Sequence, residues 1–264
     1  MNARGDSAVA CSFVRSFPPN DRFMIIGHFS GIPARAMTFL RGLARNNRKE
    51  WFEEHRADYE SQLKRPMMQL VEEVDVRLAE ITPEIVGSPK KSMFRIHRDV
   101  RFSNDKSPYK THAACWFFHR DAGSGVGGDA AHGGAGFYFH IAPTGSFCGG
   151  GIWMPPRPAL QRIRQSLVDD AEAFENIVLA RGFKRRFGAL DPEAMLKRMP
   201  RGFREDHPVA KWLRYQSFTA GAALTADDVH SANLPNVLAR HYGVIAPLVR
   251  WLNDSLGLKR RSMR

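Results

Sequence analysis

The sequence predicts an α+β protein with an antiparallel or mixed sheet of about 4–6 strands in hairpins, flanked by N-terminal and C-terminal helices. Apolar residues recur every three or four positions before residue 82 and again after residue 157, the pattern of amphipathic helices. Between residues 94 and 154, short alternating segments with short connections are typical of hairpins rather than of parallel strands joined by helices. We therefore expect one domain at 29–258, after a weakly ordered extension at 1–28 and before a basic tail at 259–264.

The N-terminal part predicts three helices. The first ends near Asn46. Asn47, followed three residues later by Glu50, predicts a capping box that opens the second helix. Pro66 predicts a break or kink, because proline cannot donate the helical hydrogen bond. The third helix then covers residues 67–81.

Residues 94–110 predict a strand and a turn with the densest charge in the chain. Read at period two, apolar side chains fall on one face and Arg95, His97, Asp99 and Arg101 on the other. The apolar face comprises Phe94, Ile96, Val100 and Phe102. A turn at 103–109 would follow, with Ser103 and Asp105 capping it.

More strands follow the turn. Residues 113–118 are apolar without alternation, which predicts a strand covered on both faces. The glycine-rich segment 123–136 contains G-x-G-x-x-G, but no helical pattern follows, so a hairpin loop is the better interpretation. Segments 137–141 and 147–154 predict a hairpin, whose glycines 149–151 mark a bulge or the close approach of a ligand or second backbone.

The C-terminal part predicts mostly helices. A long amphipathic helix spans 160–178, and residues 182–206 are basic and irregular. A short helix at 207–213 and a strand at 216–224 come next. Two closing helices would meet at Pro247, a residue suited to a first helical position.

Composition limits the class of protein. Of 264 residues, 43% are hydrophobic and 25% charged, and no apolar run approaches the roughly 18 residues of a membrane span. Cys11, Cys115 and Cys148 are too widely spaced for a disulfide framework, so we expect reduced thiols. Without a secretory pattern, we expect a cytoplasmic location. A net charge of +12 would attract phosphorylated metabolites, nucleic acid or acidic proteins. Alternatively, the arginines are spread over the whole surface and the charge has no specific partner.

Several segments resemble a known family. The segment F-R-I-H-R-D-V-R-F-S-N-D-K-S-P-Y-K at 94–110, N-N-R-K-E-W-F at 46–52, A-G-F-Y-F-H-I at 135–141 and G-G-G-I-W-M-P at 149–155 resemble conserved hypothetical proteins of bacteria and fungi, catalogued as a domain of unknown function. The resemblance covers residues 29–256 and implies no activity, cofactor or catalytic residue. The chain departs from the family in its extra N-terminal residues and its long glycine-rich segment at 121–135.

The first functional hypothesis is an anion site in residues 94–110. This segment has five Lys or Arg and two Asp, so positive charge remains after full pairing. Arg98 falls on the otherwise apolar face, where an unpaired guanidinium would be costly. Guanidinium groups suit bidentate binding of phosphate or carboxylate, and an aromatic ring could stack on a base or sugar. The candidate ligand-binding residues are Arg95, Arg98, Arg101, Asp105, Lys106, Tyr109, Lys110 and His140.

Three alternatives stay open. Asp99 and Asp105 could neutralise the arginines in a purely structural network. An enzyme could use Asp99 or His97 as general base, with the arginines stabilising an oxyanion. A nucleic-acid-binding or interaction module could use the basic segment at 184–204, although no recognition motif supports it.

The sequence identifies no metal site or cofactor. The spacings of His97, His112, His119 and His140 match no ligand motif. A phosphorylated or carboxylated small molecule is the partner that the charge pattern favours, and the pattern does not specify the oligomeric state.

Overall fold

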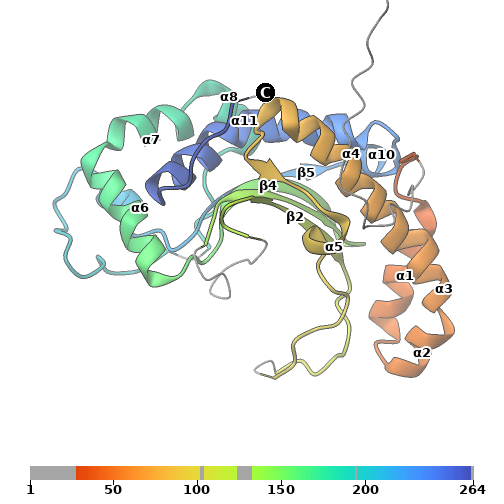
Figure 1. The fold of residues 1–264 in the computed structure, drawn as a ribbon. Helices are drawn as coiled ribbons and strands as arrows, with labels where there is room; N and C mark the ends of the chain where they lie inside the picture. The colour runs from red at the N-terminus through yellow and green to blue at the C-terminus, as the bar shows by residue number, and fades with distance from the viewer. Residues whose placement is uncertain (1–27, 102–103, 124–132, 194, 263–264) are drawn as a thin grey trace, which may run out of the picture.

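The computed structural model describes residues 28–101, 104–123, 133–193 and 195–262, and the predicted extension therefore lies almost wholly outside the described residues. Its centre is a five-stranded antiparallel sheet in the order β1-β2-β3-β4-β5, which confirms the predicted class (Figure 1). The strands are β1 (Ile85–Val86), β2 (Ala113–His119), β3 (Gly136–Ile141), β4 (Ser146–Ile152) and β5 (Phe218–Leu224).

Helices precede and follow the sheet. Those before β2 are α1 (Ala34–Arg45), α2 (Lys49–Glu54), α3 (Arg56–Asp58), the π-helix η1 (Tyr59–Lys64), α4 (Arg65–Ile81) and α5 (Pro89–Ser92). Those after β4 are α6 (Arg157–Asp169), α7 (Ala171–Val178), α8 (Arg181–Phe187), α9 (Ala210–Leu213), α10 (Ala226–His230) and α11 (Leu234–Ser255). None of them, within the described part of the chain, combines the length and apolar content needed to cross a bilayer.

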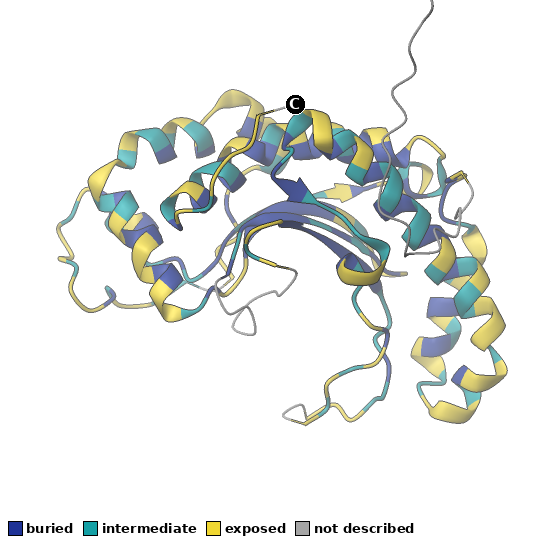
Figure 2. Ribbon diagram, in the orientation of Figure 1, coloured by how far each residue is buried: buried dark blue, intermediate teal, exposed yellow. Residues whose placement is uncertain are grey.

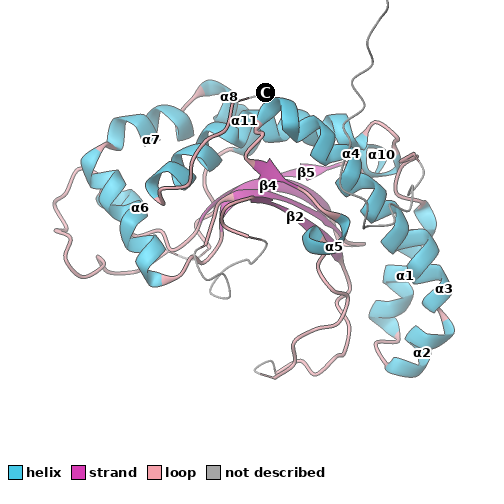
Figure 3. Cartoon of the chain, in the orientation of Figure 1, coloured by secondary structure: helices cyan, strands magenta, loops and turns pink. Residues whose placement is uncertain are grey.

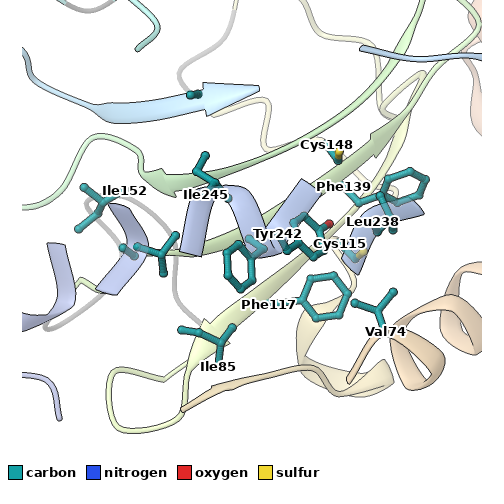
Figure 4. Close-up of a cluster of buried hydrophobic side chains, with 14 of the residues drawn as sticks. Val74, Ile85, Cys115, Phe117, Phe139, Cys148, Ile152, Leu238, Tyr242 and Ile245 are labelled. Carbon is teal, nitrogen blue, oxygen red and sulfur yellow. The ribbon is translucent and has the colours of Figure 1, made fainter. Parts of the chain in front are cut away.

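The sheet arches, and α4 and α11 cover its convex face (Figure 1). Every residue of β2 is buried, which confirms the strand covered on both faces. On the helix side, alternate residues of neighbouring strands, including Phe117, Phe139 and Cys148, meet Tyr242 and Leu238 of α11 (Figure 4). Figure 2 shows this buried centre between exposed outer surfaces of the helices. Burial of these apolar side chains stabilises the fold by roughly 1.5–3 kcal/mol for each large one.

Cys115 and Cys148 are free and buried, in agreement with the predicted thiols, whereas Cys11 lies outside the described residues.

Two helix boundaries differ from the prediction. The segment predicted as one helix at 160–178 is two, because Asp170 leaves helical geometry and its side chain caps α7 by accepting from the Ala173 N–H at 3.1 Å. The two closing helices are instead the single α11, with Pro247 inside it. Proline removes one helical hydrogen bond, but burial of residues on both sides of Pro247 against the sheet outweighs that loss.

The first predicted helices are largely confirmed. α1 ends at Arg45, next to Asn46. Pro66 lies in the first turn of α4, directly after η1, so helical regularity changes at the predicted place. The capping box is wrong, however: the residue before α2 is Arg48, and no side chain caps that helix.

Candidate functional site

Residues 94–101 and 104–110 form an arm that leaves the sheet, and the strand predicted from residue 94 is wrong in its described part (Figure 3). Isolated bridges join Met93 to Cys115 and His97 to Tyr109, and no continuous ladder forms in the described part of the arm. The alternating pattern was present, but a strand needs a partner along its length, and the two limbs of the arm meet at only a few backbone bonds. Phe102 and Ser103, including the predicted capping by Ser103, lie outside the described residues.

Asn47 fastens the arm to the N-terminal helices. Its side-chain Nδ2 donates to the Tyr109 carbonyl at 2.9 Å, and its Oδ1 accepts from the Tyr109 N–H at 3.0 Å. The amide thus satisfies both backbone groups of one residue, which explains why it caps no helix. The Tyr109 ring is 3% exposed and stacks on Phe52 with centroids 4.3 Å apart. In this arrangement Tyr109 packs in the core, and its ring is not presented for stacking on a ligand.

Two ion pairs form in the outer part of the arm. Arg98 Nη1 is paired with Asp105 Oδ2, and Arg101 Nη2 lies 2.6 Å from Asp99 Oδ2. Lys106 Nζ donates to the Val100 carbonyl at 2.9 Å. For both arginines, the structure matches the alternative in which the aspartates neutralise them in a purely structural network.

The two candidate bases, Asp99 and His97, have different surroundings. Hydrogen bonds from the Arg101 side chain and N–H hold the pKa of Asp99 well below its usual range. A carboxylate so stabilised is a weak proton acceptor at neutral pH. His97 is exposed, with its ring centroid 5.1 Å from that of Tyr109. A catalytic role for either residue stays a hypothesis that this geometry does not favour.

Two cations at the base of the arm have no ion-pair partner among the described residues, although the charge of Arg95 helps to lower the pKa of Asp99. Among the described residues, no acidic side chain forms an ion pair with Arg95 or Lys110. Lys110 Nζ lies 5.4 Å from the centroid of Phe94. Burial lowers the pKa of Lys110, and the positive charges of Arg95 and Arg98 lower it further. Cations are therefore concentrated here beyond what the arm neutralises.

We name Arg95, Arg98, Lys110 and His112 the basic cluster. A cavity of about 320 Å³ is lined by Arg98, Asp99, Lys110, Thr111 and His112. Burial lowers the pKa of His112, and the charges of Lys110 and Arg98 add to this effect. Arg95 of the cluster and His97 also line a second cavity, of about 420 Å³, against α3 and η1.

His140 connects the basic cluster to the sheet. Its ring stacks on His112 with centroids 4.5 Å apart and on Phe147 with centroids 4.8 Å apart. Tyr138 Oη lies 3.2 Å from His140 Nδ1. Burial, with a contribution from His112, lowers the pKa of His140 to about 4. His140 is therefore neutral at pH 7, able to donate or accept one hydrogen bond at each nitrogen according to its tautomer.

The four histidines considered as metal ligands do not all come together. His119 Nε2 lies 3.2 Å from the Lys259 carbonyl, away from the stacked pair His112 and His140. The part of the chain that the structure describes holds no group of three or more His, Cys, Asp or Glu residues that could bind a metal ion. The basic segment 184–204 starts in α8, which packs on α11 rather than on the arm (Figure 1).

The concave face of the sheet carries an aromatic cavity that the sequence reading missed. Cross-strand pairing forms one row over four strands, in the order Trp116, Tyr138, Gly149 and Gly221. The first two residues carry aromatic rings, and the last two, as glycines, have no side chain. Beside this row lies a cavity of about 410 Å³. Two features of the sequence point to this cavity. Tyr138 alternates with the core-facing residues of its own strand, so its ring lies on the other face of the sheet, and three consecutive glycines occur in the next strand.

The triple glycine brings two backbones close together, as one of its predicted roles required. A Cβ at Gly149 would lie 2.3 Å from the Ala220 carbonyl oxygen, and one at Gly151 would lie 1.9 Å from that of Phe218. Gly151 also has a φ of 126°, which other residues rarely adopt. A side chain at Gly149 or Gly151 would therefore overlap the backbone of β5.

Comparison with known proteins gives a family. A family model described as "Conserved hypothetical protein (DUF2461)" matches residues 35–251. No curated protein matches the chain, and no solved structure matches it.

Proposed function

This chain belongs to the conserved hypothetical protein family DUF2461, and we propose that it binds a small phosphate or carboxylate anion at the basic cluster. The observation that carries the proposal is the half-buried Lys110, close to Arg95 and Arg98 and without a carboxylate of its own among the described residues. Like charges held together raise the free energy of the site, and a bound anion would lower it.

In this proposal the residues of the arm have different roles. Arg98 and Lys110 line the cavity of about 320 Å³, so they would contact the anion directly. Arg101, Asp105 and Lys106 belong to the outer arm, where they fix its shape. His112, which lines the same cavity, would donate a hydrogen bond from the sheet side, and His140 stacks on it with ring centroids 4.5 Å apart.

A pair of lysine variants tests the proposal. Lys110→Met keeps most of the apolar side chain over Phe94 but removes the charge, and it should weaken binding of inorganic phosphate or pyrophosphate by about 10-fold or more. Lys106→Met removes the same charge from the outer arm and should change the affinity by less than about 3-fold. Isothermal titration calorimetry measures both. Equal affinities of the two variants and the unsubstituted protein would reject the basic cluster as the site.

The salt dependence of binding separates this function from the nucleic-acid alternative. Contacts to a polyanion release counterions, so affinity for an oligonucleotide would fall steeply with salt, with a log–log slope of about −0.7 per contacted phosphate of a single strand. A small anion held in a cavity should show a shallow dependence. An oligonucleotide that binds more tightly than pyrophosphate, with a steep slope that Lys110→Met leaves unchanged, would favour the nucleic-acid alternative.

A further inference from the structure

The cavity on the concave face of the sheet differs in charge from the molecule as a whole. The chain carries a net charge of +12, yet the described residues that line this cavity include two carboxylates and no Lys, Arg or His. Five of the lining residues are aromatic: Phe94, Trp116, Tyr138, Phe147 and Trp153. The bare backbones of Gly149 and Gly221 form part of its floor. An apolar cavity of about 410 Å³ with a few polar groups fits the usual dimensions of a small-molecule site.

The two carboxylates belong to the segment before β5. Asp191 is fixed to that strand, because its N–H donates to the Thr219 carbonyl at 2.8 Å and its Oδ2 accepts from Thr219 Oγ1 at 3.0 Å. Glu193 is near enough for its charge to raise the pKa of Asp191, in addition to the larger effect of burial. Neither carboxylate forms an ion pair with a cation in the part of the chain that the structure describes.

The aromatic rings distinguish these carboxylates from an ordinary acidic surface. A cation over the face of an aromatic ring is attracted by the negative charge of that face, most strongly for Trp. Trp153 is 56% exposed although it is a large apolar residue, and Phe147 is 39% exposed. Large exposed rings beside uncompensated carboxylates are features of sites that recognise alkylated ammonium groups.

We propose that this cavity binds an organic ammonium cation, which would lie against the aromatic rings with Asp191 and Glu193 supplying the opposite charge. The ligand chemistry is opposite in sign to that of the basic cluster, and no residue of the cluster lines this cavity. The inference therefore goes beyond the anion site, and either one can fail without the other.

Matched probes test the charge preference. Tetramethylammonium and choline provide the cation, and 3,3-dimethylbutan-1-ol has the shape of choline without its charge. Binding is followed by quenching of tryptophan fluorescence, to which Trp116 and Trp153 in the lining should contribute. Choline should bind at least about 10-fold more tightly than the neutral alcohol. Equal affinity for the two probes, or no binding of either cation, would overturn the proposal.

Substitutions then test the location. Gly221→Val should abolish tetramethylammonium binding. A Cβ at Gly221 makes only ordinary contacts, with the Cys148 carbonyl oxygen at 3.5 Å and Phe147 Cδ2 at 3.6 Å, so the added side chain would take up space beside Phe147 in the cavity. Asp191→Asn and Glu193→Gln should each weaken binding by about 3- to 10-fold, whereas Glu172→Gln on the surface of α7 should have no effect.

Two results would place the cation elsewhere. One is unchanged tetramethylammonium binding in a folded Gly221→Val protein, with folding checked by circular dichroism. The other is equal binding in Asp191→Asn, Glu193→Gln and Glu172→Gln, which decides the question even if Gly221→Val does not fold.

Discussion

His140 shows how burial sets the chemistry of a single residue in this protein. Two aromatic neighbours and a tyrosine hydroxyl surround its ring, and this environment lowers its pKa from the ordinary 6.5 to about 4. The folded chain thus binds this proton only at low pH, whereas the unfolded chain binds it near pH 6.5. The group therefore contributes stability that is fully present above pH 6.5 and is lost as the pH falls towards 4.

Replacing His140 with Phe should remove this pH dependence. Phe keeps the stacking on His112 and Phe147 but cannot titrate. Between neutral pH and pH 4.5, the free energy of unfolding of the unsubstituted protein should fall by roughly 1–2 kcal/mol more than that of His140→Phe, after allowing for the partial exposure of the ring. Urea unfolding across that pH range measures the difference. Parallel pH profiles would show that the imidazole is not protected from protonation.

At the scale of elements, β4 and β5 depend on two glycines that face each other but have different roles. The register pairs Gly149 with Gly221. A Cβ at Gly149 would overlap the Ala220 carbonyl oxygen, whereas a Cβ at Gly221 would have its nearest neighbour, the Cys148 carbonyl oxygen, at 3.5 Å. The first glycine allows two backbones to approach, whereas a methyl group at the second would make only ordinary van der Waals contacts.

Alanine substitutions should separate these roles. Gly149→Ala should lower the free energy of unfolding by about 2–4 kcal/mol, because backbone must move to admit the methyl group. Gly221→Ala should change it by less than about 1 kcal/mol. Urea unfolding of both variants is the measurement, and equal destabilisation would mean that the close approach at Gly149 does not constrain the sheet.

The same elements show what sequence patterns can and cannot predict. Period-two alternation at 137–141 and helical spacing at 67–81 identified β3 and α4, because burial of one face selects those residues directly. The alternation at 94–102 was equally clear but belongs to the arm, since a pattern does not reveal whether a partner strand is present. Pro247 was misleading because the packing of α11 on the sheet outweighs a local preference.

The candidate site was predicted less completely. Residues 94–110 were identified as charged, but which cation pairs with which carboxylate depends on the shape of the arm. The row Trp116, Tyr138, Gly149 and Gly221 exists only through the register of four strands, which no local pattern gives.

At the scale of the whole molecule, the arm joins the N-terminal helices to the sheet, and the basic cluster lies where they meet. Asn47 makes the connection from the helical side, through both of its bonds to Tyr109. From the sheet side, the Ala114 carbonyl accepts from the Phe94 N–H at 3.1 Å. The positions of Arg95 and Lys110 therefore depend on contacts made outside the arm.

Asn47→Ala should loosen the arm without unfolding the protein. Loss of two hydrogen bonds at the half-buried Asn47 should cost about 1–3 kcal/mol of stability and increase hydrogen–deuterium exchange at residues 94–112. The affinity for inorganic phosphate should also fall as the arm loosens. Asn104→Ala, at an exposed position in the outer arm, is the control and should change neither. Unchanged exchange in Asn47→Ala would mean that other contacts hold the arm.

The most direct test of the anion site is an NMR titration of the ring protons of His112 with and without inorganic phosphate. Lys110 and Arg98 contribute to the low pKa of His112, so an anion bound between them and the ring should offset their charges. We expect phosphate to raise the pKa of His112, and chloride at the same ionic strength to leave it unchanged. A His112 pKa that is the same in both salts would contradict anion binding at the basic cluster.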